Sequence, residues 1–104
     1  MDVEVVVSEG RSVALDSFDL LLILAMAMEF SGPPGSGCGR VVVALRDEVE
    51  SRRVSLERLS PLAYKGLMRA LFEGYTEART HWRRPEALVN WESLLRVACS
   101  DPRY

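Results

Sequence analysis

The sequence has few of the residues from which metal sites and disulfide frameworks are built. Its 104 residues include two cysteines and one histidine. Neither Cys38 nor Cys99 has a second cysteine or a histidine at metal-ligand spacing, and small secreted domains usually carry more cysteines. We therefore expect two free thiols, no metal, no cofactor and a cytoplasmic location, because a reducing compartment keeps thiols free.

Long hydrophobic runs are also missing. The longest apolar run, residues 20–28, has nine residues, whereas a membrane-spanning helix needs about 20. Residues 1–4 (MDVE) lack the basic region that opens a signal peptide, so we expect no membrane role. With 48% hydrophobic and 27% charged residues, the composition is that of a globular protein, and the length predicts a single domain over residues 1–104.

No pair of side chains is spaced as a catalytic nucleophile and its base. His81 has no serine or cysteine at such a spacing, although pairing with a residue distant in sequence stays open. Glu73 and Glu77 stand four residues apart on a predicted helix, but nothing indicates an apolar pocket that would separate their pKa values. We therefore predict that the chain is not an enzyme.

Residues 32–40, GPPGSGCGR, resemble the phosphate-binding loop of adenylate kinases and related nucleoside triphosphatases over these nine positions only. In that family a lysine for the phosphates and a serine or threonine for magnesium follow the last loop glycine. Those positions hold Cys38 and Gly39 here. The family's loop joins a strand to a helix, whereas we expect this one to join a helix to a strand. We therefore predict a Gly/Pro-rich connecting loop over residues 31–39 and no bound nucleotide.

Alternating valines predict that the chain opens with a β-hairpin. Every second residue from 3 to 7 is valine, and Glu9-Gly10 can form the turn, so we expect strands near 2–8 and 11–15. A helix over residues 17–30 follows. It is apolar nearly all round, which places it centrally between the sheet and another helix.

A second hairpin is expected in the middle of the chain. The valine-rich residues 41–45 have high β-propensity, and Asp47-Glu48 can turn the chain into a strand over residues 50–56. A helix over residues 46–59 is the alternative for this region.

Two helices close the sequence. Ser60-Pro61 is a capping residue followed by a proline at the first helical position, and apolar residues then recur at helical spacing to about residue 81. We expect Gly66 and Gly74 on the opposite face. Pro85 opens the last helix, which ends before residue 101. The predicted fold is α+β, in the order ββα-ββ-αα: a small antiparallel sheet of three or four strands in two hairpins, with about three helices on one face.

Charge is unevenly distributed along the chain. Residues 1–39 hold six acids and one base, whereas residues 40–104 hold nine acids and twelve bases, and the formal net charge is −2. Twelve of the thirteen bases are arginine, whose planar guanidinium suits carboxylates and phosphates. Arginine-favouring codons of a GC-rich genome account for this excess as readily, so it decides nothing alone.

The segment over residues 79–84 is the first candidate binding site. It brings basic and aromatic side chains to a helix end: Arg79, His81, Trp82, Arg83 and Arg84. Arginine and tryptophan are frequent anchors of protein interfaces, and both also stack on single-stranded bases. An ordinary helix end accounts for the segment without any partner, because Trp82 continues the apolar stripe and the dipole favours arginine there.

Acidic side chains at the predicted second turn are the second candidate. Asp47, Glu48 and Glu50 form a negative rim if they meet the acids of the first hairpin, Asp2, Glu4 and Glu9. Such a rim steers basic partners toward a protein, and it also serves plain solubility.

These features favour a non-catalytic module that binds another protein. The expected type is a small inhibitor or immunity-like protein that neutralises an enzyme or toxin, or an adaptor or assembly subunit, and a homodimer is a related option. The alternative is a nucleic-acid-binding module that uses residues 79–84. The negative net charge argues against that alternative, because nucleic-acid-binding domains are normally basic.

Overall fold

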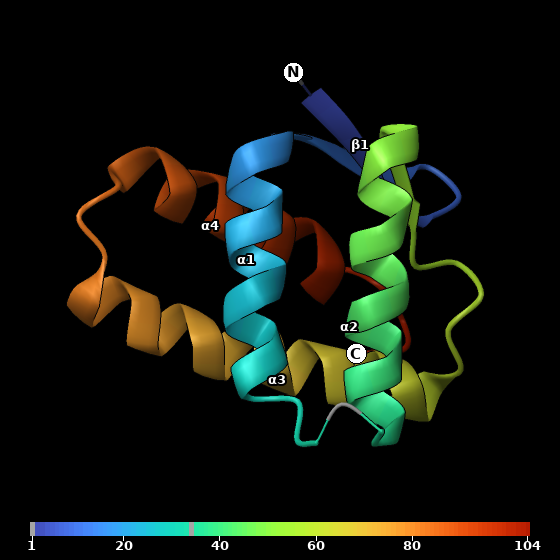
Figure 1. Cartoon of the computed structure of the whole chain (residues 1–104). Coiled ribbons are helices and arrows are strands. Elements are labelled where there is room, and N and C mark those ends of the chain that lie inside the picture. Colours follow the sequence, from blue (N-terminus) through green and yellow to red (C-terminus); the bar gives the residue numbers. More distant parts are fainter. Residues whose placement is uncertain (1, 34) are drawn as a thin grey trace.

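The computed structural model describes residues 2–33 and 35–104, which form a three-stranded sheet and four α-helices (Figure 1). The strands are β1 (Asp2–Ser8), β2 (Arg11–Asp16) and β3 (Arg53–Ser55). The helices are α1 (Ser17–Glu29), α2 (Gly37–Glu48), α3 (Pro61–His81) and α4 (Pro85–Cys99), and a short 3-10 helix, η1 (Val49–Ser51), follows α2. The α+β class is confirmed, but the element order is ββααβαα and not the predicted ββα-ββ-αα.

The sheet is built on the alternating valines of β1. β1 pairs antiparallel with β2 and parallel with β3, in the order β2-β1-β3. Val3, Val5 and Val7 are buried while Glu4 is exposed, and α1, α2 and α4 all contact the sheet. The first predicted hairpin is confirmed. The second is wrong, because β3 follows a helical crossover, and such a crossover brings a strand back parallel.

The valine-rich residues 41–45 belong to α2 and not to a strand. Val42, Leu45 and Val49 recur at helical spacing and are at most 6% exposed. Valine costs a helix about 0.7 kcal/mol or less relative to alanine, which is little beside the burial of these side chains. Ser36 caps the helix by accepting a hydrogen bond from the Gly39 amide at 3.1 Å. Packing and capping therefore outweigh the β-propensity on which the strand prediction was based.

The region that follows combines both alternatives expected from its sequence. The helical alternative is correct as far as residue 51, because residues 46–48 complete α2 and residues 49–51 form η1. Arg52 then takes a left-handed conformation, with φ of 60°, and turns the chain into β3. The expected strand over residues 50–56 is thus reduced to three residues.

The predicted loop over residues 31–39 is shorter in the structure and joins two helices. Residues 37–39 form the first turn of α2, and Pro34 lies outside the described residues. The helix-to-strand connection expected there is therefore wrong. The strand-to-helix setting of the phosphate-binding loop is absent as well.

Helix α1 lies centrally, as its apolar sequence predicted. It contacts α2, α3 and α4 as well as both strands of the hairpin, and Figure 1 shows α2 beside it and α3 crossing its lower end. Asp16 caps α1 by accepting hydrogen bonds from the amides of Phe18 and Asp19. The capping residue thus fixes the point where β2 gives way to the central helix.

Gly74 on α3 faces the core, contrary to the expectation that both helical glycines lie on the opposite face. A Cβ atom there would lie 3.1 Å from the ring of the fully buried Trp91 and 3.2 Å from Cγ of Met26. At Gly66 the nearest atoms would be those of Cys38, at an ordinary 3.9 Å. Only Gly74 is therefore required for a close approach between helices.

This difference predicts opposite effects for two alanine substitutions on the same helix. Gly74→Ala is expected to lower the free energy of unfolding by about 1–3 kcal/mol, because the added methyl group would push against the fully buried Trp91 ring. Gly66→Ala is expected to raise it by up to about 1 kcal/mol through helix propensity. Urea denaturation of both variants measures the two effects. Stabilisation by Gly74→Ala would contradict the prediction and show that the Trp91 ring can shift to accept the methyl group.

The C-terminal segment is fastened to the core through Arg103. Its guanidinium donates to the buried Asp101 carboxylate, with Nε 2.9 Å from Oδ1 and Nη2 3.1 Å from Oδ2. Nη1 donates to the carbonyls of Leu56 and Leu59 at 2.7 and 2.9 Å, and Nη2 to the carbonyl of Val7 at 2.8 Å. One side chain thus ties together the end of β1, the segment after β3 and the end of the chain. We call this group the Arg103 clasp.

Tyr64 lies beneath the clasp. The Arg103 guanidinium carbon is 4.1 Å from the centre of its ring, and the Tyr64 hydroxyl donates to the carbonyl of Ala98 at 2.6 Å. Burial, assisted by the Asp101 charge, raises the pKa of Tyr64 to about 12. The clasp therefore rests on a neutral, hydrogen-bonded aromatic residue.

Candidate functional site

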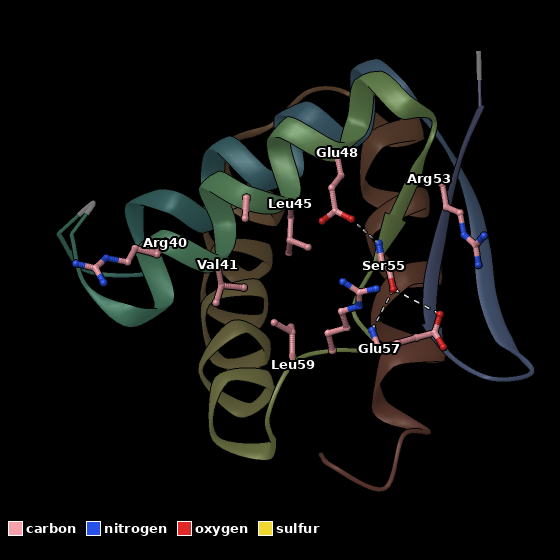
Figure 2. A pocket seen from close by; sticks show the side chains of 10 residues that line it. Arg40, Val41, Leu45, Glu48, Arg53, Ser55, Glu57 and Leu59 are labelled. Atoms are coloured by element: carbon pink, nitrogen blue, oxygen red, sulfur yellow. Dashed lines mark hydrogen bonds between the residues drawn. The ribbon is translucent and has the colours of Figure 1, made fainter.

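An open cleft of about 880 Å³ lies between α2 and the segment that includes β3 and residues 57–59 (Figure 2). We call it the α2–β3 cleft. Its apolar lining comes from α2 and from the segment after β3, and its polar lining from both sides of the cleft. The ten lining residues are Arg40, Val41, Ala44, Leu45, Glu48, Arg53, Ser55, Glu57, Arg58 and Leu59.

The helical spacing of α2 places its side chains in this cleft. Val41, Leu45 and Glu48 project toward it from one face of the helix, and Leu59 approaches from the opposite side (Figure 2). Leu45 is 4% exposed, so it forms the floor, whereas Ala44 is exposed. The result is an apolar base beside a strand.

β3 is an edge strand, and its free edge borders the cleft. Leu56 donates to the Val6 carbonyl and Arg52 accepts from the Glu4 amide, so alternate residues of this segment face β1. The backbone groups of Arg53 and Ser55 then face away from β1, as parallel pairing requires. The Ser55 amide donates to Glu48 Oε1 at 3.3 Å. A side chain of α2 thus occupies one position of the strand edge.

Arginine side chains at the cleft are less engaged than its glutamates. Glu48 accepts a hydrogen bond from the Ser55 amide, and Glu57 accepts one from the Ser55 hydroxyl at 3.5 Å. Arg53 reaches Glu4 only at 3.7 Å, and both side chains are more than half exposed. Arg58 and Arg40 form no ion pair with any other described residue. The side chains of Arg58 and Arg40 thus form no hydrogen bond with another described residue, whereas each of the two glutamates accepts one.

The three acidic residues predicted as a binding rim are divided between two hollows. Glu48 faces the α2–β3 cleft, whereas Asp47 and Glu50 line a second hollow of about 610 Å³ with Leu21 at the start of α1. Glu4 lies beside Arg53 across the β1–β3 pair, and Glu9 sits in the hairpin turn beyond the other end of β1. The structure thus brings Asp47 and Glu50 together at one hollow, and Glu48, Glu4 and Glu9 do not line that hollow with them.

Most of the predicted Arg/Trp segment makes contacts within the chain. Trp82 packs on Trp91 with ring centres 5.4 Å apart, and the guanidinium of Arg79 lies 5.9 Å from the centre of the Tyr75 ring. His81 Nε2 lies 3.1 Å from Glu77 Oε1, with both side chains at least half exposed. Trp82 and Arg79 therefore pack on aromatic residues near the α3–α4 connection, whereas His81 contacts a glutamate of its own helix.

Arg84 differs from its neighbour Arg83. Arg84 Nε is 2.7 Å from Oδ1 of Asp19, whose side chain is 4% exposed, and Asn90 donates to the other carboxylate oxygen at 2.7 Å. The bond to Asp19 raises the pKa of Arg84 above its usual value. Arg83 is exposed and forms no ion pair with another described residue. Of this pair, Arg83 alone is free to meet a partner.

Other reactive groups do not converge. Cys38 and Cys99 are free, and burial raises the pKa of both thiols, which disfavours the nucleophilic thiolate. Within residues 2–33 and 35–104, no group of three or more histidine, cysteine or acidic residues is placed to hold a metal ion. No helix in that part of the chain has the length and apolar character to cross a bilayer.

The α2–β3 cleft was not predicted from the sequence. Its signal is the helical spacing of residues 38, 42, 45 and 49, which competes with the β-propensity of the same segment. No family model, curated protein or solved structure matches the chain.

Proposed function

We propose that this chain is a non-catalytic protein-binding module that receives a segment of its partner in the α2–β3 cleft. The observation that carries the proposal is the cleft itself, which combines an apolar floor, the free edge of a strand and arginines without an ion pair. An exposed strand edge beside pockets for side chains is a recurring form of binding site for an extended peptide segment. A small inhibitor, an immunity-like protein or an adaptor acting in the cytoplasm fits this size and chemistry.

The nucleic-acid alternative has less support from the contacts of residues 79–84. Trp82 packs on Trp91 and Arg84 binds Asp19, so neither is free to stack on bases. The remaining exposed cations there, Arg79 and Arg83, belong to a chain with a formal net charge of −2. We therefore place the partner site at the α2–β3 cleft.

Site-specific crosslinking tests the proposal. A photoreactive benzoylphenylalanine at Ala44, in the cleft, is expected to give a discrete adduct in a lysate of the native host. The same group at Ala25, an exposed position on α1, serves as the matched control and is expected to give none. Mass spectrometry of the adduct identifies the partner, which can then be purified.

Binding of that purified partner decides the outcome. Ala44→Trp fills the cleft and is expected to weaken binding by about tenfold or more through steric exclusion, whereas Ala25→Trp leaves it unchanged. Equal binding by wild type and Ala44→Trp would place the interface elsewhere. The absence of any adduct from position 44 would also contradict the proposal.

A further inference from the structure

We infer that the occupant of the α2–β3 cleft is an extended, acidic segment of the partner protein, which adds as a strand to β3 and displaces the Glu48 side chain. This inference rests on the proposed function and specifies the partner's chemistry. It has three supports: the free backbone edge, the unpaired arginines and the position of Glu48.

The backbone of β3 supplies the first support. The outward amide and carbonyl of Arg53 form no hydrogen bond with the rest of the described chain. Protein chains commonly bind an extended segment along such an edge, where main-chain hydrogen bonds give affinity and alternate side chains give specificity. The edge lies beside the apolar floor formed by Leu45 and Leu59, so an added strand has a surface for every second side chain.

Charge supplies the second support. The cleft is lined by three arginines and two glutamates, and both glutamates accept hydrogen bonds from Ser55. Arg58 has no partner of opposite charge within the described residues, and neither has Arg40, whose guanidinium points away from the cleft in Figure 2. Guanidinium groups bind carboxylates in bidentate geometry. Aspartate or glutamate side chains on the added strand match these groups, whereas basic ones are repelled.

Glu48 supplies the third support. Its carboxylate accepts the Ser55 amide bond (Figure 2), at a position that the carbonyl of an added strand would otherwise take. Edge strands are often protected in such ways against unwanted pairing. Glu48 therefore acts as an internal cap, and an incoming acidic segment releases it both by competing for the amide and by charge repulsion.

A library of random eight-residue peptides displayed on phage tests the inference. The whole chain is the target, and peptides that also bind the Ala44→Trp variant are removed. The remaining peptides are expected to alternate aspartate or glutamate with apolar residues. Hydrogen exchange of the Arg53 amide is expected to slow when such a peptide binds, because the amide gains a backbone acceptor.

Three variants separate the contributions to peptide affinity. Arg58→Glu is expected to weaken binding by about tenfold or more, whereas Arg96→Glu, an equal charge change at an exposed site on α4, leaves it nearly unchanged. Glu48→Gln is expected to strengthen binding by about threefold, because the competing acceptor loses its charge. Each affinity is measured by fluorescence anisotropy with a labelled peptide.

The outcomes distinguish the two proposals. If no peptide depends on an open cleft, the proposed function and the inference both fail. Peptides that need the cleft but bind Arg58→Glu equally well contradict the acidic character of the segment. Peptides that leave the Arg53 amide exchanging freely contradict strand addition. In both cases the proposed function stands. A loss of affinity in Glu48→Gln would show that Glu48 contacts the peptide and is not displaced by it.

Discussion

Replacing Arg103 with leucine is expected to lower the free energy of unfolding by about 3–5 kcal/mol, because it leaves the buried Asp101 carboxylate without its cation. The substitution also removes the donors to three backbone carbonyls, those of Val7, Leu56 and Leu59. A domain of this size is usually stable by about 5–15 kcal/mol in total. Urea denaturation followed by circular dichroism measures the loss.

Arg96→Leu is the matched control for this prediction. Arg96 is exposed on α4 and forms no ion pair with another described residue, so its replacement is expected to change stability by less than about 0.5 kcal/mol. Equal effects of the two substitutions would show that the Arg103 clasp contributes nothing beyond an ordinary surface residue.

Lowering the pH is expected to reduce the loss of unfolding free energy caused by Arg103→Leu. Hydrogen bonds from Arg103 hold the pKa of Asp101 far below its usual value. A carboxylate with a lowered pKa in the folded state stabilises the protein above its unfolded pKa of about 3.9, and that stabilisation is lost as the pH falls toward the folded value. The stability difference between wild type and Arg103→Leu is therefore expected to narrow from about pH 7 to about pH 2.5. A constant difference would contradict the role of the charge pair.

The Arg103 clasp also bears on the cleft. Arg103 donates hydrogen bonds to the carbonyls of Leu56 and Leu59, which stand just before and just after Glu57 and Arg58. Glu57 and Arg58 both line the α2–β3 cleft. The clasp holds this wall at two points. The end of the chain therefore contributes to the geometry of the cleft.

Local signals predicted the hairpin and three of the helices. Alternating valines gave β1, and Ser60-Pro61 marked the start of α3, where the Ser60 hydroxyl accepts from the Ala63 amide. The apolar run of α1 indicated a central helix. These elements were predictable because caps and periodicity depend on residues close in sequence.

Helix α2 and the cleft depend on contacts that the sequence does not display. The valines of residues 41–45 favour a strand locally, and the burial of Val42 and Leu45 against the core, together with the Ser36 cap, decides for a helix. The parallel pairing of β3 with β1 joins segments about fifty residues apart. Gly74 was misplaced for the same reason, because Trp91, the residue it contacts, lies on another helix.

Arg84 illustrates how the same limit affects a candidate binding site. In sequence it is one of several arginines at a helix end, next to Arg83. Its ion-pair partner, Asp19, lies 65 residues away and is buried at the start of α1. Arg84 thus stabilises the fold through a contact with a residue distant in sequence, whereas Arg83 stays exposed.

Replacing Arg84 with alanine is therefore expected to lower the melting temperature by about 5–10 °C, because the Asp19 carboxylate stays buried without its cation. Arg83→Ala, one residue away, is expected to leave it nearly unchanged. In an Asp19→Asn background the effect of Arg84→Ala should shrink, since a double-mutant cycle cancels all contributions except the coupling between the two side chains. Equal melting temperatures for the Arg83 and Arg84 variants would mean that Asn90 alone satisfies Asp19, and Arg84 would then rejoin Arg83 as a residue free to meet a partner.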